Sequence, residues 1–114
     1  MAWPTKLGEA FNFRSRRIET WEVNFIRDAA NGRRLKPSQH ALQRAIDHGL
    51  TTADMLSIVL NGQAVEKDLP GDSIDRKPGL SFVGIGPSGI LAKVKVTFLD
   101  GVGYQFVTIH PVEA

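Results

Sequence analysis

The fold is decided by residues 51–69, TTADMLSIVLNGQAVEKDL, where the spacing of the apolar side chains changes from a helical to a strand period. Thr51 or Thr52 is the expected helix N-cap, and Asp54, three residues after Thr51, supports the first turn. The apolar stripe of this helix is formed by Met55, Leu56, Val59 and Leu60. The helix is expected to end at Asn61-Gly62, and a strand is expected over residues 64–69. Helices are therefore expected before residue 62 and strands after it.

Two further helices are predicted upstream. One begins at the N-cap Ser38 and stops at Gly49. The other is expected over residues 14–30, ahead of an Asn31-Gly32 stop. The apolar stripe of this first helix is formed by Ile18, Trp21, Phe25, Ile26 and Ala29. Glu22 projects into that stripe, which leaves two interpretations: a buried functional acid, or a side chain at the core margin that pairs with an arginine.

Four strands are predicted after residue 62, over residues 64–69, 80–85, 90–99 and 104–112. Short Gly-rich turns between them favour antiparallel neighbours. Alternation in the third strand places Ile90, Ala92, Val94, Val96 and Phe98 on one face, and Lys93, Lys95 and Thr97 on the other. In the fourth strand alternation places Tyr104, Phe106, Thr108 and His110 on one face.

The predicted fold class is α+β, with N-terminal helices packed on a four-stranded antiparallel sheet. Residues 1–114 are expected to form a single domain. Its three parts are a basic N-terminal arm and helix at 1–36, a helix-turn-helix pair at 37–62 and an antiparallel sheet at 63–114.

Composition excludes several classes of protein. No apolar run approaches the roughly 20 residues of a membrane span, so no membrane partner is expected. The absence of cysteine excludes disulfides and thiolate metal sites. His40 and His48 are too far apart to chelate one ion from one helix, and we expect neither a metal nor a cofactor. The amino terminus lacks the pattern of a secretory signal peptide.

Positive charge is concentrated in the first part of the chain. Residues 1–50 hold nine Lys or Arg against five acids, whereas the remainder holds five against seven. The cluster consists of Arg14, Arg16, Arg17, Arg27, Arg33, Arg34 and Lys36. Such a cluster can neutralise nucleic-acid phosphates, and it is equally typical of a solubilising or partner-docking surface. The candidate RNA contacts from it are Arg14, Arg16, Arg17, Arg33 and Arg34.

A titratable base lies beside a permanent cation on the second helix. Helical geometry puts His40, Gln43, Arg44 and Asp47 in one arc, with His48 at its rim, opposite Ala41, Leu42, Ala45 and Ile46. Imidazole moves protons near neutral pH, and guanidinium holds anionic oxygens, so the pair suits phosphate chemistry. A solvated helix surface is the alternative.

The segment also resembles a known family. It reads His40-Ala41-x-x-Arg44-x-x-x-His48-Gly49-Leu50-Thr51-x-x-Asp54-Met55, followed by Ile58-Val59-Leu60-Asn61-Gly62 and a closing Val107-Thr108-Ile109-His110-Pro111. Over about residues 37–112 this resembles the family called domain of unknown function 4258, which is related to the RelE and BrnT-like toxin superfamily of small ribonucleases. The chain departs from that family at His48, usually arginine, and at His110, usually tyrosine or another residue.

The resemblance implies a RelE-like toxin fold and a metal-independent endoribonuclease, or an inactive RNA-binding relative, that acts as a toxin or effector domain. RNA cleavage needs a base for the ribose 2′-OH, an acid for the leaving 5′ oxygen and cations for the phosphate charge. His40 and His110 are the candidate proton-transfer groups. Arg44 with Lys93 or Lys95 would hold the charge, and Thr108 would orient a neighbour or bind phosphate. A strand-end surface histidine and aggregation-blocking lysines are the alternatives for His110 and for the lysine pair.

The expected partners of such a toxin are RNA and a cognate antitoxin or immunity protein. Its site of action would be the cytoplasm, reached directly or by delivery within a larger effector. The alternative function is a non-catalytic interaction module, such as an antitoxin, immunity or inhibitor protein, that docks through its arginine-rich first helix. These two functions differ in whether His40, Arg44 and His110 converge.

Overall fold

The computed structural model describes residues 16–69, 78–99 and 103–112. Its helices are α2 (Thr20–Asn31), α3 (Gln39–Asp47) and α4 (Thr52–Asn61). Its strands are β1 (Leu35–Pro37), β2 (Gln63–Asp68), β3 (Gly79–Ile85), β4 (Leu91–Leu99) and β5 (Gly103–Pro111).

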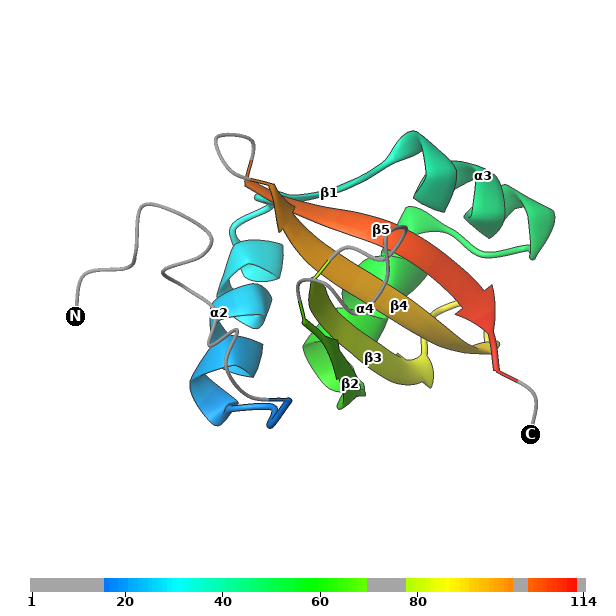
Figure 1. Ribbon diagram of the computed structural model, residues 1–114. Helices are drawn as coiled ribbons and strands as arrows, with labels where there is room; N and C mark the ends of the chain where they lie inside the picture. The colour runs from blue at the N-terminus through cyan, green and yellow to red at the C-terminus, as the bar shows by residue number, and fades with distance from the viewer. Residues whose placement is uncertain (1–15, 70–77, 100–102, 113–114) are drawn as a thin grey trace.

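The strands of the described residues form one mixed sheet in the order β1-β5-β4-β3-β2. β1 is parallel to β5, and the other neighbours are antiparallel. α4 lies behind the central strands, α2 stands at one end of the sheet, and α3 lies beyond β5 (Figure 1). The core lies between the helices and one face of the sheet, where Ile26, Met55, Phe82 and Phe106 have no exposed surface. The predicted α+β class is confirmed.

The predicted all-antiparallel, four-stranded sheet is wrong, because β1 adds a fifth, parallel strand. Three residues are too few to show a strand period in the sequence. Pro37 is tolerated in β1 because the strand lies at the edge of the sheet, where a missing backbone donor costs little.

α2 begins later than predicted. Residues 16–19 are not helical, and Arg14 lies outside the described residues. The backbone N–H of Glu19 donates to Glu22 Oε1 at 2.9 Å, which closes the first turn at Thr20. The expected stop is confirmed, since Gly32 follows the last helical residue.

The predicted cap of α3 is confirmed, and of the two threonines expected to cap α4 it is Thr51 that does so. Ser38 Oγ accepts from the Ala41 N–H at 3.0 Å, and Gly49 adopts a left-handed φ of +70° after α3. Before α4, Asp54 Oδ2 accepts at 2.8 Å from both the backbone N–H and the hydroxyl of Thr51.

Asp54 also holds the turn between β3 and β4. Its Oδ1 accepts from the Ser88 N–H at 2.8 Å, and its Oδ2 accepts from the Ser88 hydroxyl at 2.6 Å. A Cβ at Gly86 would lie 2.6 Å from Oδ1, so only glycine fits there. One carboxylate therefore fixes both the start of α4 and the turn that packs against it.

The apolar arc of α3 is narrower than predicted. Ala41 and Ala45 are buried, but Leu42 is 40% exposed and Ile46 is 72% exposed. α3 packs on β5 and on the edge strand β1 rather than on the middle of the sheet, and the buried residues of α3 are the two alanines.

A β-bulge changes the predicted faces of the last strand. Lys95 is paired with Thr108 and Val96 with Phe106, so Val107 is the extra residue. Phe106 therefore faces the core, whereas Thr108 lies on the opposite face, and the prediction that they share a face is wrong.

We expect Asp54→Asn to lower the free energy of unfolding by about 2 kcal/mol at pH 7, because it removes a charged acceptor of several hydrogen bonds. Burial raises the pKa of Asp54, but hydrogen bonds from Ser88 and Thr51 outweigh it and hold the pKa below its ordinary value. The stabilisation is thus present above the ordinary carboxyl range and is lost as the pH falls through the depressed pKa. Urea unfolding at a series of pH values measures it.

The matched control is Asp47→Asn, which removes an exposed carboxylate that accepts only from Gln43 in the described structure. It is expected to change the free energy of unfolding by less than about 0.5 kcal/mol. The assigned role predicts that Asp54→Asn lowers the free energy of unfolding more at pH 7 than at pH 2. An equal loss at both pH values would contradict it.

Candidate functional site

α3 lies along an edge of β5 that β1 does not cover. The last paired residue of β1 is Pro37, opposite Phe106. The next residue, Ser38, donates its N–H to the Phe106 carbonyl at 2.9 Å and its hydroxyl to the Val107 carbonyl at 3.3 Å. The start of α3 is therefore fixed beside the middle of β5, and the helix continues along the rest of that strand (Figure 1).

Charged and titratable groups from three elements surround His110. Lys93 of β4 is its register partner on β5, and Lys95 is the register partner of Thr108. The pKa of His110 is lowered, first by partial loss of solvent around the ring and then by the charges of Lys93, His48 and Arg44. The carboxylate of Glu66 raises it, but by less. Lys93, Arg44, His48 and Glu66 thus all lie within electrostatic reach of His110, which favours its neutral form at neutral pH.

The structure places the four candidate catalytic residues along one edge of the sheet. Arg44 lies within electrostatic reach of His110, and Thr108 precedes His110 by two positions on β5. His40 is exposed on α3, one turn before Arg44 and about 12 Å along the axis from His48. The histidine of α3 that influences His110 is therefore His48.

Sequence reasoning missed His48 and Glu66 as members of this site. His48 lies at the rim of the helical arc that holds Arg44, and this position indicates from the sequence that the two side chains are neighbours. Glu66 joins through an ion pair across β3, where its Oε2 lies 2.7 Å from Lys93 Nζ. No local pattern in the sequence reveals that pairing.

The two candidate lysines of β4 are paired with acids. Besides the Lys93–Glu66 contact, Lys95 Nζ lies 2.6 Å from Asp68 Oδ2, and both of those side chains are nearly buried. A phosphate at either lysine would therefore compete with a carboxylate. Their role as phosphate contacts stays a prediction.

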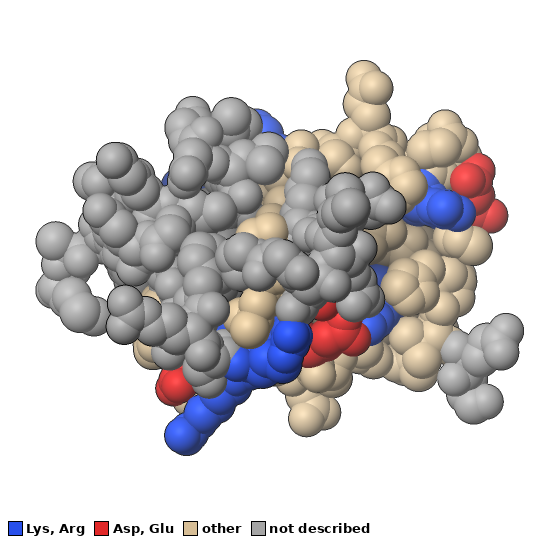
Figure 2. All heavy atoms as spheres, in the orientation of Figure 1, with Lys and Arg blue, Asp and Glu red and all other residues tan. Residues whose placement is uncertain are grey.

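The candidate arginines form two groups rather than one cluster. Arg16 and Arg17 are exposed before α2, and Arg33 and Arg34 are exposed after it, so a helix of 12 residues, about 18 Å, separates them. Arg17 Nε also lies 3.9 Å from Glu19. Figure 2 shows that the basic and acidic side chains visible on one face lie in small mixed groups. Arg14 lies outside the described residues.

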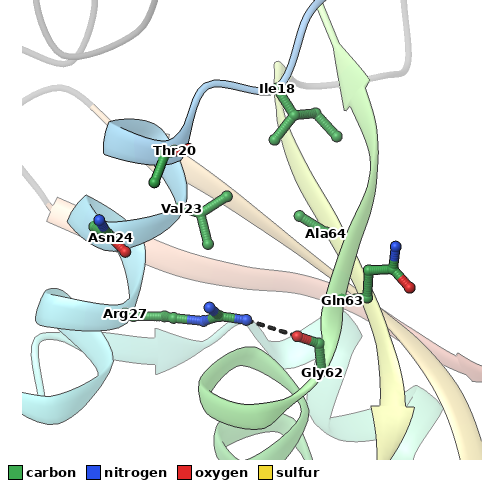
Figure 3. Close-up of a pocket in the computed structure, with 8 residues that line it drawn as sticks. All are labelled: Ile18, Thr20, Val23, Asn24, Arg27, Gly62, Gln63 and Ala64. Carbon is green, nitrogen blue, oxygen red and sulfur yellow. Dashed lines mark hydrogen bonds between the residues drawn. The ribbon is translucent and has the colours of Figure 1, made fainter.

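A cavity of about 440 Å³ lies between α2 and β2 (Figure 3). Arg27 is its only charged lining residue within the described chain. None of the described lining residues comes from α3 or β5, so this cavity is separate from the groups around His110. Arg27 therefore does not belong with the solvent-facing arginines.

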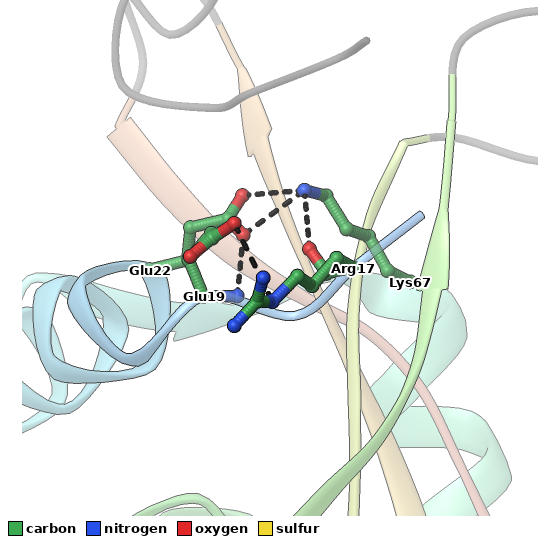
Figure 4. A network of polar contacts seen from close by, with 4 residues as sticks. All are labelled: Arg17, Glu19, Glu22 and Lys67. Carbon is green, nitrogen blue, oxygen red and sulfur yellow. Dashed lines mark hydrogen bonds and ion pairs between the residues drawn. The ribbon is translucent and has the colours of Figure 1, made fainter. Parts of the chain in front are cut away.

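Glu22 is fully buried, and its partner is a lysine rather than the expected arginine. Both Glu22 carboxylate oxygens lie 2.9 Å from Lys67 Nζ, and neither side chain has exposed surface (Figure 4). Lys67 Nζ also donates to the Arg17 carbonyl at 3.1 Å. This pair joins α2 to β2, and the prediction that Glu22 lies at the core margin is wrong.

No family model, curated protein or solved structure matches this chain. In the described residues, no three His, Asp or Glu side chains are grouped so as to hold a metal ion. No helix among them has the length and apolar character needed to cross a membrane.

We expect Lys93→Gln to raise the pKa of His110, because the substitution removes a cation and leaves the Glu66 carboxylate to stabilise the imidazolium. Arg44→Gln is expected to act in the same direction. The measurement is an NMR titration of the three histidine rings.

The matched control is Lys36→Gln, an exposed lysine of β1, which should leave the His110 titration unchanged. An unaltered His110 titration in Lys93→Gln would show that the charges around His110 are not coupled.

Proposed function

We propose that this domain is a small RelE-like toxin-fold endoribonuclease that cuts RNA without a metal ion. The observation that carries the proposal is that Arg44 of α3, His48 at the C-cap of that helix and Lys93 of β4 all lie within electrostatic reach of the exposed His110. The resemblance of residues 37–112 to domain of unknown function family 4258 supports the same proposal.

In the proposed reaction the neutral imidazole of His110 takes the proton from the ribose 2′-OH. The 2′ oxygen attacks phosphorus, and the bond to the 5′ oxygen breaks as a second histidine protonates it. The electrostatic coupling to His110 supports His48 as this acid, with His40 as the other candidate. Arg44 and Lys93 hold the charge that develops on the phosphoryl oxygens. The products are a 2′,3′-cyclic phosphate and a 5′-OH.

The arginines beyond this edge would bind the flanking RNA. Arg33 and Arg34 follow α2 and directly precede β1, which leads into α3. They are therefore closer along the chain to the proposed site than Arg16 and Arg17 are. The expected partners remain RNA and a cognate antitoxin or immunity protein, and the expected site of action remains the cytoplasm, reached directly or within a larger effector.

One observation favours the alternative, a non-catalytic interaction module. Leu42 and Ile46 are exposed one turn apart on α3, and exposed apolar pairs are common where a helix docks on a protein. This apolar pair lies on the same helix as Arg44. A protein partner bound there would cover the proposed RNA site, which is also how an antitoxin could block a toxin.

We expect the wild-type protein to cleave single-stranded RNA in excess chelator, because the proposed reaction uses protein acids and bases. His110→Gln is expected to lower the single-turnover rate about 100-fold or more with little change in RNA affinity. Comparison of His48→Gln with His40→Gln identifies the acid, because only the true acid should produce a comparable loss. Cleavage that chelator abolishes and a divalent ion restores contradicts the mechanism.

Neutralising Arg33 and Arg34 together is expected to weaken RNA binding and to reduce the slope of log affinity against log salt by about 1.4 to 1.8, at roughly 0.7 to 0.9 per lost contact. Turnover of bound RNA should stay nearly unchanged. The control is the Arg16/Arg17 double variant, at the other end of α2. If the wild type binds no RNA at low salt, the interaction module replaces the nuclease.

A further inference from the structure

Arg27 is fixed in place by one edge of its guanidinium. Its Nε donates to the Val59 carbonyl at 2.9 Å, and its Nη2 donates to the Gly62 carbonyl at 2.6 Å. Its Cζ also lies 5.9 Å from the centroid of the Phe82 ring. These contacts hold the end of α4 against α2, and they orient the guanidinium before any ligand arrives.

The second edge of the same guanidinium is open. A guanidinium carries five N–H groups, and Nε and Nη2 form the edge already used by the two carbonyls. The other edge, Nη1 with the second N–H of Nη2, has no partner in the described residues. In Figure 3 the unbonded terminal nitrogen points toward Val23, on the side of the guanidinium away from Gly62. The two N–H groups of this edge are spaced so that each can donate a hydrogen bond to one oxygen of a carboxylate.

The cavity around this edge has polar and apolar walls. Thr20, Asn24 and Gln63 line it with hydroxyl and amide groups, whereas Ile18, Val23 and Ala64 line it with hydrocarbon. No acidic residue lines it in the described part of the chain, so the positive charge of Arg27 is not neutralised within the cavity. Its volume of about 440 Å³ is enough for a small molecule, and the cavity is largely open to solvent, so a ligand can enter it.

We propose that the cavity between α2 and β2 binds a small monocarboxylate with a compact apolar body. The carboxylate would accept two hydrogen bonds from the open edge of Arg27, and the apolar body would contact Ile18, Val23 and Ala64. A carboxylate is favoured over a phosphate dianion because Arg27 carries one positive charge and no second cation lines the described part of the cavity. The site is separate from His110 and does not rest on the proposed nuclease activity.

The test is an NMR titration of the intact chain with benzoate, followed at the Arg27 side chain and at the backbone of α2 and β2. Benzyl alcohol, which lacks the charge, and phenyl phosphate, which carries more charge, are titrated in parallel. We expect saturable shifts with benzoate, weaker binding of phenyl phosphate and no saturation with benzyl alcohol.

The decisive variant is Gln63→Glu, which places a carboxylate at the cavity while preserving the backbone pairing of Gln63 with Val83. It is expected to weaken benzoate binding at least about tenfold, because two like charges at the same cavity repel each other even at an effective dielectric of about 20. The control Gln39→Glu makes the same charge change on α3 and should alter the affinity by less than about twofold. These variants leave the structural contacts of Arg27 intact.

Three results would overturn the proposal. One is the absence of saturable shifts with benzoate, which would leave Arg27 with a purely structural role. Another is equal affinity in Gln63→Glu and the wild type, which would place binding elsewhere. The third is tighter binding of phenyl phosphate than of benzoate, which would make phosphate the ligand class.

Discussion

One extra residue in β2 determines how the sheet is held to the helices. Ala64 is paired with Phe82 and Glu66 with Ser81, so Val65 bulges out of the register. Without this bulge, alternation from Ala64 would turn Glu66 and Asp68 toward the core and Lys67 away from it. With it, Lys67 reaches the buried Glu22, and the two acids face Lys93 and Lys95. A buried ion pair is costly unless its geometry is good, so α2 is bound to a single register of β2.

The bulge at Val107 has a matching effect on the other side of β4. It turns Thr108 and His110 toward the face of Lys95 and Lys93. Two irregular positions, one in β2 and one in β5, therefore bring acids, lysines and a histidine onto the same face. α3 then adds Arg44 and His48 from the edge of the sheet. The candidate site thus depends on departures from regular strand geometry, which are common next to functional sites.

The features that could be predicted from sequence are those with local causes. Ser38, Thr51 with Asp54, and Gly49 mark helix ends by chemistry within a few residues, and the structure agrees. β1 could not be predicted, because its pairing partner is distant and its own pattern is only three residues long. The two bulges could not be predicted for a related reason. Assigning side chains to faces by strict alternation assumes that no extra residue interrupts the strand. In the candidate site, alternation predicts that Lys93 and Lys95 share a face of β4. It does not predict that Glu66 and Asp68 of β2 pair with them.

The parallel pairing of β1 with β5 also has a consequence for biosynthesis. Leu35 leaves the ribosome before its partner Tyr104, which follows only after the other helices and strands of the described chain. The edge of β4 that pairs with β5 therefore has no strand partner until β5 has been synthesised, and α3 lacks the strand on which most of its contact with the sheet is made. Long-range closures of this kind slow folding and leave strand edges open to aggregation. The nascent chain is thus most vulnerable just before its last strand emerges.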